Sequence, residues 1–100
     1  MATVMVMKWS SVTPEQYDAA REAVDWEGDP PQGGIYHIAW FDEGLNVVDL
    51  WESADDFNRF GEERLMPGIA HLGVEGQPDV TFHEAHRYFD SAAQRAKVSS

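Results

Sequence analysis

The chain has 100 residues, 43% of them hydrophobic, and carries a formal net charge of −11 at neutral pH. This length suits a single domain that buries roughly two-thirds of its surface on folding, and the apolar content excludes a disordered chain. The negative charge argues against nucleic acid and anionic membrane surfaces as partners, because both would repel it. The sequence contains no Cys, which excludes disulfides and thiolate chemistry.

No segment of the sequence has the pattern of a membrane span or of a signal peptide. The longest apolar run falls far short of the length of a spanning helix, about 20 residues. The N-terminal residues lack the succession of basic, apolar and small residues that a signal peptide shows. We therefore expect a cytoplasmic protein with no membrane partner.

The first predicted elements are a strand over residues 3–8 and a helix that follows it. The segment Thr13–Gln16 (TPEQ) has the pattern of a capping box with Pro at the first helical position. We expect the helix to end near Asp25, and residues 27–34 to form a loop because they are dense in turn formers. The predicted inner face of the helix carries Tyr17, Ala20 and Val24.

A hairpin is predicted next, with strands over residues 34–41 and 45–52. The three residues 42–44 between them suit a type I turn followed by Gly44 in the left-handed region. A two-residue turn would force Glu43 to positive φ, which is disfavoured for a residue with a side chain.

The second half of the chain predicts one more helix and one more strand. Ser53 caps the helix, and Pro67 stops or kinks it, while residues 68–72 add one more turn. The last strand is predicted over residues 80–89. The predicted inner stripe of the helix carries Phe57, Phe60 and Leu65.

The element order is βαββαβ, which predicts an α+β, ferredoxin-like fold: a four-stranded antiparallel sheet with two helices on one face. We place this single domain at residues 1–90 and expect residues 91–100 to form a flexible tail. Because two helices cover one face of such a sheet and the strand over residues 34–41 is apolar on both, we expect a second copy of the chain to cover the other face, which gives a homodimer. The two apolar sets of that strand are Ile35, Ala39 and Phe41, and Tyr36, Ile38 and Trp40.

The strand end Asp49-Leu-Trp51, followed by a Glu-Ser pair and an aromatic-rich helix, resembles the dimeric α/β-barrel superfamily. Within it, the chain is similar to the antibiotic-biosynthesis-monooxygenase-like proteins over roughly residues 3–89. The resemblance implies a dimeric α/β barrel with a pocket between sheet and helices in each subunit. Such proteins include cofactor-independent oxygenases of aromatic polyketides and quinols, haem-degrading enzymes and cyclases. Relatives often have Glu in place of Asp49, and many carry a His where Phe60 stands here, so a mechanism that relies on that His is not expected.

The hairpin predicts one constellation that bears chemistry. With a three-residue loop, Phe41 pairs with Leu45, and counting back along both strands sets His37 directly opposite Asp49. Because a carboxylate fixes the tautomer of a His and raises its basicity, this pair suits a general base for a phenol or a carbon acid. We take His37 and Asp49 as the candidate catalytic residues, with Trp51 on the same face as an aromatic wall. The alternatives are a buried polar pair that only satisfies itself, or a two-residue loop that sends the pair to opposite faces.

The candidate ligand-binding residues are Trp51, Phe60, Met5, Met7, Tyr17 and His71. Adaptable Met side chains suit a ligand pocket for a small hydrophobic or aromatic molecule, and they suit a core equally well. His71 enters through the resemblance, because haem-degrading relatives place an aromatic residue on the second helix and an Ala-His pair after it, here Phe60 and Ala70-His71. His71 falls one residue late for that role, Pro67 intervenes, and the first strand lacks the pocket Asn of those relatives.

The His residues do not predict a metal site. His83 and His86 are three positions apart on the predicted last strand, so they face opposite ways, one toward the helices or pocket and the other toward a partner or solvent. No pair among the four His residues has the spacing of a helical or finger-type metal site. We expect no metal and no cofactor, with haem as the alternative given above.

Two function hypotheses from different classes lead. In the first, the protein binds a small aromatic or polyketide-like molecule in a pocket between sheet and helices and acts on it as a cofactor-independent monooxygenase or an isomerase, with His37 as base. In the second, it is a non-catalytic ligand-binding or stress-responsive dimer whose polar residues are structural. Haem binding or degradation is a third.

Overall fold

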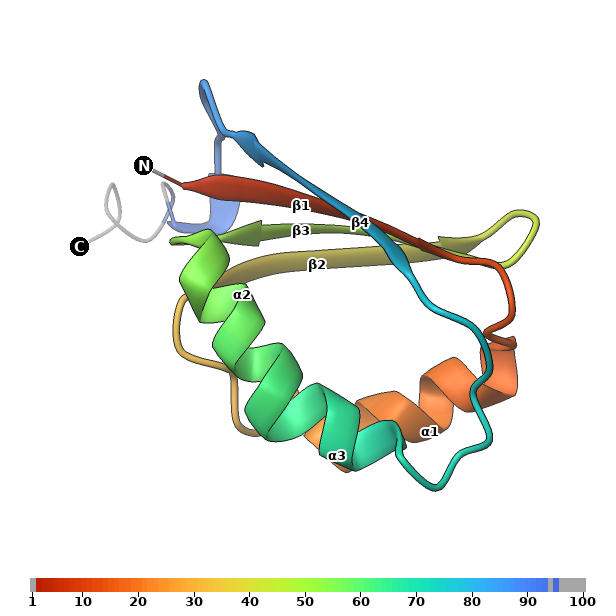
Figure 1. Ribbon diagram of the computed structural model, residues 1–100. Helices are drawn as coiled ribbons and strands as arrows, with labels where there is room; N and C mark the ends of the chain where they lie inside the picture. Colours follow the sequence, from red (N-terminus) through yellow and green to blue (C-terminus); the bar gives the residue numbers. More distant parts are fainter. Residues whose placement is uncertain (1, 94, 96–100) are drawn as a thin grey trace.

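Four antiparallel strands and a layer of helices form the fold in the computed structural model, which describes residues 2–93 and 95 (Figure 1). The strands lie in the order β2-β3-β1-β4, and the helices cover one face of the sheet. This is the predicted ferredoxin-like βαββαβ arrangement. The elements are β1 (Thr3–Trp9), α1 (Pro14–Val24), β2 (Gly34–Phe41), β3 (Leu45–Trp51), α2 (Ala54–Phe60), the π-helical segment η1 (Gly61–Leu65), α3 (Met66–Ile69) and β4 (Asp79–Glu84).

The capping box at the start of α1 is present as predicted. The Thr13 hydroxyl accepts a hydrogen bond from the Gln16 N–H at 3.2 Å, and the Gln16 side chain accepts one from the Thr13 N–H at 3.1 Å. These two bonds satisfy N–H groups that have no partner inside the helix. The helix ends at Val24, where Asp25 takes a left-handed conformation with φ of 50°. The predicted inner face is confirmed, since Tyr17, Ala20 and Val24 all pack against the core.

The hairpin between β2 and β3 has the predicted loop length and register but a different backbone at its tip. Phe41 pairs with Leu45, so the loop has three residues. However, Glu43 takes a left-handed φ of 53°, a conformation that we expected at Gly44 alone; Gly44 has φ of 100°. The tip closes through a hydrogen bond of 3.0 Å from the Asp42 N–H to the Gly44 carbonyl, which replaces the pattern of the predicted type I turn.

The second helix continues past Pro67, where the sequence predicts a stop or a kink. Its middle part is η1, in which the N–H of Met66 bonds to the Gly61 carbonyl five residues earlier. This π turn widens the spacing between donors and carbonyls just before Pro67, which has no N–H to donate, and the helix then runs on as α3 to Ile69. Among the described residues, no helix combines the length and the apolar character needed to cross a membrane.

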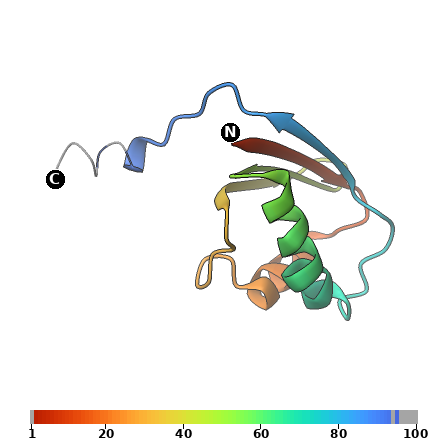
Figure 2. The same ribbon diagram turned by 60° about the vertical axis from the view of Figure 1, so that its left-hand side comes forward.

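β4 is shorter than predicted. It ends at Glu84, which pairs with Thr3 at the start of β1, and the Ala85 N–H makes a last hydrogen bond to the Ala2 carbonyl. Residues 85–89 are not part of the strand. Figure 2 shows this segment (blue) running away from the sheet and helices. Within the predicted tail, residues 91–93 and 95 are helical. Residues 94 and 96–100 lie outside the described residues.

The core lies between the sheet and the helices. Alternate residues of the central strands point into it, among them Met5 and Met7 of β1 and Val47 of β3. The inner stripe of the second helix, Phe57, Phe60 and Leu65, packs against this cluster. Helices α1, α2 and α3 lie on this one face of the sheet, and on the opposite face the β2 side chains Tyr36, Ile38 and Trp40 are 40%, 58% and 47% exposed. The predicted two-sided apolar character of β2 is confirmed.

Candidate functional site

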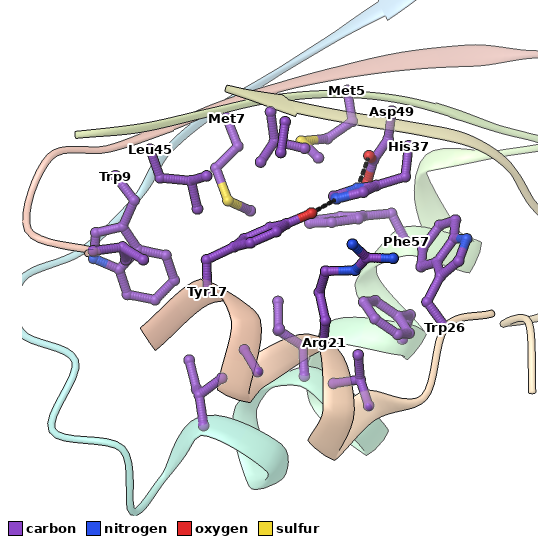
Figure 3. A pocket seen from close by; sticks show the side chains of 18 of the residues that line it. Met5, Met7, Trp9, Tyr17, Arg21, Trp26, His37, Leu45, Asp49 and Phe57 are labelled. Carbon is purple, nitrogen blue, oxygen red and sulfur yellow. Dashed lines mark hydrogen bonds and ion pairs between the residues drawn. The ribbon is translucent and has the colours of Figure 1, made fainter. Parts of the chain in front are cut away.

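A cavity of about 500 Å³ lies between the sheet and the helices. This volume is within the range of small-molecule pockets, and the lining is predominantly apolar, as such pockets require. Every layer of the fold contributes to it: β1, β2 and β3 from the sheet, and α1, α2, η1 and α3 from the helices (Figure 3). Among the lining residues, those with polar or charged side chains on the cavity face of the fold are Gln16, Tyr17, Arg21, Glu27, His37 and Asp49.

The predicted pair of His37 and Asp49 is formed on the cavity face of the sheet. The two residues are direct partners across β2 and β3, and the His37 Nδ1 lies 2.6 Å from Asp49 Oδ1. The Asp49 side chain is 5% exposed and that of His37 is 23% exposed, so the carboxylate is the buried end of the pair. Because a carboxylate accepts, the hydrogen-bond network assigns the ring proton to Nδ1 and leaves the Nε2 lone pair free to accept.

Trp51 holds the second oxygen of the same carboxylate. Its indole Nε1–H donates to Asp49 Oδ2 at 3.1 Å, and the side chain is fully buried. The ring packs edge-on against Trp26 and Phe57. Trp51 does not line the cavity, so the expectation that it forms an aromatic wall is wrong. Its ring is buried in the core beside the cavity, where its hydrogen bond supports the Asp49 carboxylate.

Tyr17 completes a chain of hydrogen bonds that the sequence did not predict. Its hydroxyl lies 2.6 Å from His37 Nε2, and since Nε2 accepts, the hydroxyl donates. The cavity thus contains a continuous path from Tyr17 through His37 to Asp49 and on to Trp51, drawn in Figure 3 as far as the carboxylate. Sequence reasoning placed Tyr17 on the inner face of α1 but found no spacing that joined it to His37.

The ionisation of Tyr17 is governed by its surroundings. Burial raises the pKa of Tyr17 above its ordinary value of 10.0, the nearby Arg21 guanidinium lowers it, and the negative charges of Asp49 and Asp18 raise it. The net effect is a raised pKa, so the neutral phenol is the form present at physiological pH. That form is the one able to donate to His37.

Two further lining residues, Arg21 and Trp26, were missed. The Arg21 guanidinium lies 5.9 Å from the centre of the Tyr17 ring and forms an ion pair with Glu27 at the C-terminal end of α1. Trp26 lies 5.4 Å from the His37 ring and 5.7 Å from the Phe60 ring, measured between ring centres, and takes the wall position expected of Trp51. Arg21 follows Tyr17 by four residues, which is a helical signal for one face; Trp26 follows the end of the helix and carries no periodic signal.

Of the other predicted ligand-binding residues, three line the cavity and one does not. Met5, Met7 and Phe60 line the cavity and are also buried core residues, so the Met pair has the core position that one alternative gave, and its role in binding a ligand stays a prediction. His71 is exposed beyond the end of α3 and does not line the cavity. The residues therefore do not fit haem, because the proposed iron ligand lies outside the space that a bound porphyrin would occupy.

Neither His83 nor His86 faces the cavity, contrary to the expectation that one of them would. His83 pairs with Val4 on the open face of the sheet and is exposed, while His86 is exposed and lies beyond the end of β4. The shortened strand removes the alternation on which the expectation rested. Over residues 2–93 and 95, no group of His, Asp or Glu side chains is arranged to hold a metal ion.

No family model matches the chain, and no curated protein matches it. Solved structures do share its fold. SnoaB, a cofactor-independent oxygenase from Streptomyces nogalater solved as a mutant, superposes with a TM-score of 0.62 at 13% identity over 87% of this chain and 95% of its own. An antibiotic biosynthesis monooxygenase superposes at 0.53 with 19% identity over 87% and 100% of the two chains. A conserved protein from Methanosarcina mazei superposes at 0.54 with 12% identity over 82% and 89%. The chain therefore has the ferredoxin-like fold that the sequence resemblance implied.

Proposed function

We propose that the protein binds a small aromatic or polyketide-like molecule in the cavity and oxidises it as a cofactor-independent monooxygenase. The observation that carries the proposal is the His37–Asp49 pair, which faces a largely apolar cavity of about 500 Å³. The apolar walls favour a flat hydrocarbon framework, and the single polar chain on the sheet side favours a ligand with a hydroxyl at one edge.

The chemistry begins with loss of a proton from a phenolic, enolic or activated carbon acid. His37 holds that proton as an imidazolium, and the carboxylate of Asp49 stabilises the positive charge. The resulting anion is electron-rich enough to react with O2. In the complete reaction a CH2 group becomes a carbonyl that takes one oxygen atom, and the other oxygen atom leaves as water with the two hydrogens.

The shared fold supports this proposal at the level of class. SnoaB is described as a cofactor-independent oxygenase, and it has the sheet-and-helix arrangement found here. At 13% identity this likeness shows the fold alone, so the assignment to this chain depends on the cavity and its polar chain.

A second candidate function is favoured by one observation. In the part of the chain that the structure describes, no buried side-chain nitrogen or oxygen lacks a hydrogen-bond partner, and the ring nitrogens of His37 are both bonded within the protein. A non-catalytic ligand-binding protein would also need the polar side chains of its cavity to make all their hydrogen bonds within the protein, because this keeps the cavity stable.

Native mass spectrometry of the protein as purified tests for a ligand in the cavity. A small molecule that is released on denaturation would confirm that the cavity binds, and its mass would help to identify it. A protein with nothing bound would favour the second candidate, in which the hydrogen-bonded side chains of the cavity have a structural role.

The catalytic role is tested with His37→Ala, using His71→Ala as a matched control outside the cavity. Oxygen uptake is measured with anthrone, a naphthohydroquinone and a simple phenol as trial substrates. We expect His37→Ala to lower turnover by about 10²-fold or more with a smaller change in KM, as for loss of a general base. His71→Ala should leave both unchanged. Turnover that survives His37→Ala would contradict the assignment, and a loss of stability of roughly 1–3 kcal/mol without any turnover in the wild type would favour the second candidate.

A further inference from the structure

The His37 ring has no free nitrogen with which to meet a substrate. Its Nδ1–H donates to Asp49 at 2.6 Å, and its Nε2 accepts from the Tyr17 hydroxyl at 2.6 Å. A substrate hydroxyl that enters the cavity therefore meets the oxygen of Tyr17 before it meets the base. Either Tyr17 moves away, or Tyr17 itself takes the proton.

We propose that Tyr17 is a further catalytic residue, which receives the proton of the substrate hydroxyl and passes its own proton to His37. This inference rests on the proposed function and names the group that touches the substrate. As the substrate O–H bond breaks, its proton goes to the Tyr17 oxygen and its electron pair stays on the substrate oxygen. The Tyr17 O–H bond breaks in the same event, and that proton goes to His37 Nε2. The products are a substrate oxyanion, a neutral Tyr17 and an imidazolium held by Asp49.

The geometry of the two rings suits this relay. The planes of the Tyr17 and His37 rings are 7° apart and their centres are 5.9 Å apart, so the rings meet edge to edge rather than face to face. The lone pair of Nε2 lies in the plane of the imidazole, and the hydroxyl approaches it near that plane. Phe41 packs edge-on against Tyr17, with the ring centres 6.0 Å apart. Contacts with both Phe41 and His37 favour a Tyr17 ring that keeps its place when a substrate approaches its oxygen, and Figure 3 shows the hydroxyl directed at His37.

The charges around the hydroxyl fit a relay in which no tyrosinate accumulates. His37 and Asp49 face it from the sheet, and Arg21 and Asp18 act on it from its own helix. Burial and the two acidic residues raise the pKa of Tyr17, which opposes a lasting negative charge on its oxygen. A relay ends with that oxygen protonated again, so the raised pKa does not hinder it. The guanidinium of Arg21, 5.9 Å from the Tyr17 ring, then offers positive charge beside the new oxyanion.

The competing arrangement makes Tyr17 a placeholder. In that case its hydroxyl occupies the position of a substrate hydroxyl, and the ring swings out when the ligand binds. The two arrangements differ in what happens when Tyr17 is shortened: a relay loses its first proton acceptor, whereas a placeholder site gains direct access to His37.

The test uses para-nitrophenol, whose phenolate absorbs visible light and whose neutral phenol does not. The ionised fraction of the bound probe is measured at a pH where most of the free probe is neutral, for the wild type, Tyr17→Phe, Tyr17→Ala, His37→Ala and the control His71→Ala. We expect ionisation of the bound probe by the wild type and by His71→Ala. Both Tyr17 variants should lower the ratio of ionised to neutral bound probe by about tenfold or more, which corresponds to one pKa unit, and should still bind the probe.

The outcomes separate the inference from the function on which it rests. A Tyr17→Ala variant that ionises the probe as well as the wild type, or better, overturns the relay and leaves His37 as the direct base. A wild type that binds no probe, or that ionises it no better than His37→Ala does, overturns the proposed function and the relay together. Loss of ionisation in Tyr17→Phe with a normal circular dichroism spectrum supports the relay, because that variant lacks only the hydroxyl.

Discussion

Asp49 organises the polar part of the cavity because each of its carboxylate oxygens accepts one hydrogen bond. Oδ1 fixes the imidazole of His37 and Oδ2 fixes the indole of Trp51. Charge-assisted bonds of this kind are stronger than neutral ones, and a side chain that is 5% exposed keeps them from competition by water. The tautomer of His37, and with it the direction of the Tyr17 hydroxyl, therefore follows from a single buried carboxylate.

At the same scale, Tyr17 gives a pH dependence of stability whose sign can be stated. Burial raises the pKa of its hydroxyl above the ordinary value of 10.0, so this group contributes stability that is fully present below that pH. Above pH 10.0 the tyrosine hydroxyl ionises in the unfolded chain before it ionises in the folded protein. The contribution to stability is therefore lost as the pH rises toward and through the raised pKa of the folded state. We expect the free energy of unfolding to fall less steeply above that pH in Tyr17→Phe than in the wild type, as measured by urea melts along an alkaline series.

The control for this series is Tyr88→Phe, which removes a hydroxyl from a side chain that is 52% exposed. It should follow the wild type throughout. If Tyr17→Phe and the wild type lose stability with the same slope, then the hydroxyl is not protected in the folded state, and the hydrogen bond to His37 does not persist in solution.

At the scale of elements, the site depends on the register of the hairpin between β2 and β3. A shift by one residue would turn His37 away from the cavity, because successive side chains of a strand face opposite ways. The hairpin loop that sets this register requires glycine at position 44 for two reasons. Gly44 has φ of 100°, which disfavours a side chain, and a Cβ there would lie 2.4 Å from the Cα of Ser10, the residue that follows β1.

Gly44→Ala should therefore destabilise the protein more than the same change at Gly73. Gly73 also has positive φ, at 74°, but a Cβ there would meet nothing within 4 Å. We expect Gly73→Ala to cost about 1 to 2 kcal/mol, the usual penalty of the left-handed conformation. Gly44→Ala should cost roughly 1–3 kcal/mol more, because backbone atoms must move to admit the methyl group. Urea melts of both variants measure the difference, and equal losses would show that the contact with Ser10 yields easily.

The parts of the site that could be predicted from the sequence are those that depend on local order. The opposition of His37 and Asp49 follows from counting along two strands joined by a short loop, and the structure confirms it. The bond from Tyr17 depends on how α1 docks on the sheet, which no spacing encodes. Trp26 was missed because it lies in a loop whose path is set by tertiary contacts. The end of β4 depends likewise on where β1 begins, since a strand stops when its partner does.

At the scale of the whole molecule, the open face of the sheet differs from the rest of the surface. By the pairing of the strands, its central part is made of apolar side chains, and the charged residues Lys8 and Asp79 lie opposite each other at one end. Asp79 is the one acidic strand residue on this face, in a chain with 18 acidic residues. A surface whose strands carry one acidic residue, with Ile38 58% exposed and Trp40 47% exposed, is suited to contact with another apolar surface. The apolar side chains of the face are Val4, Val6, Tyr36, Ile38, Trp40, Val48 and Leu50.

We expect the partner to be a second copy of the chain, joined face to face through these side chains as a homodimer. Ile38→Asp should then convert the dimer to a monomer, because it places a charge at the centre of an apolar contact. Met66→Asp is the matched control, since Met66 is also exposed, at 53%, but lies on the helical layer. Sedimentation velocity over a range of concentrations measures both. Each copy carries a net charge of −11, so added salt should strengthen the wild-type dimer by screening the repulsion between the copies. A wild type that sediments as a monomer, or an Ile38→Asp variant that stays dimeric, would show that this face is not the contact between copies.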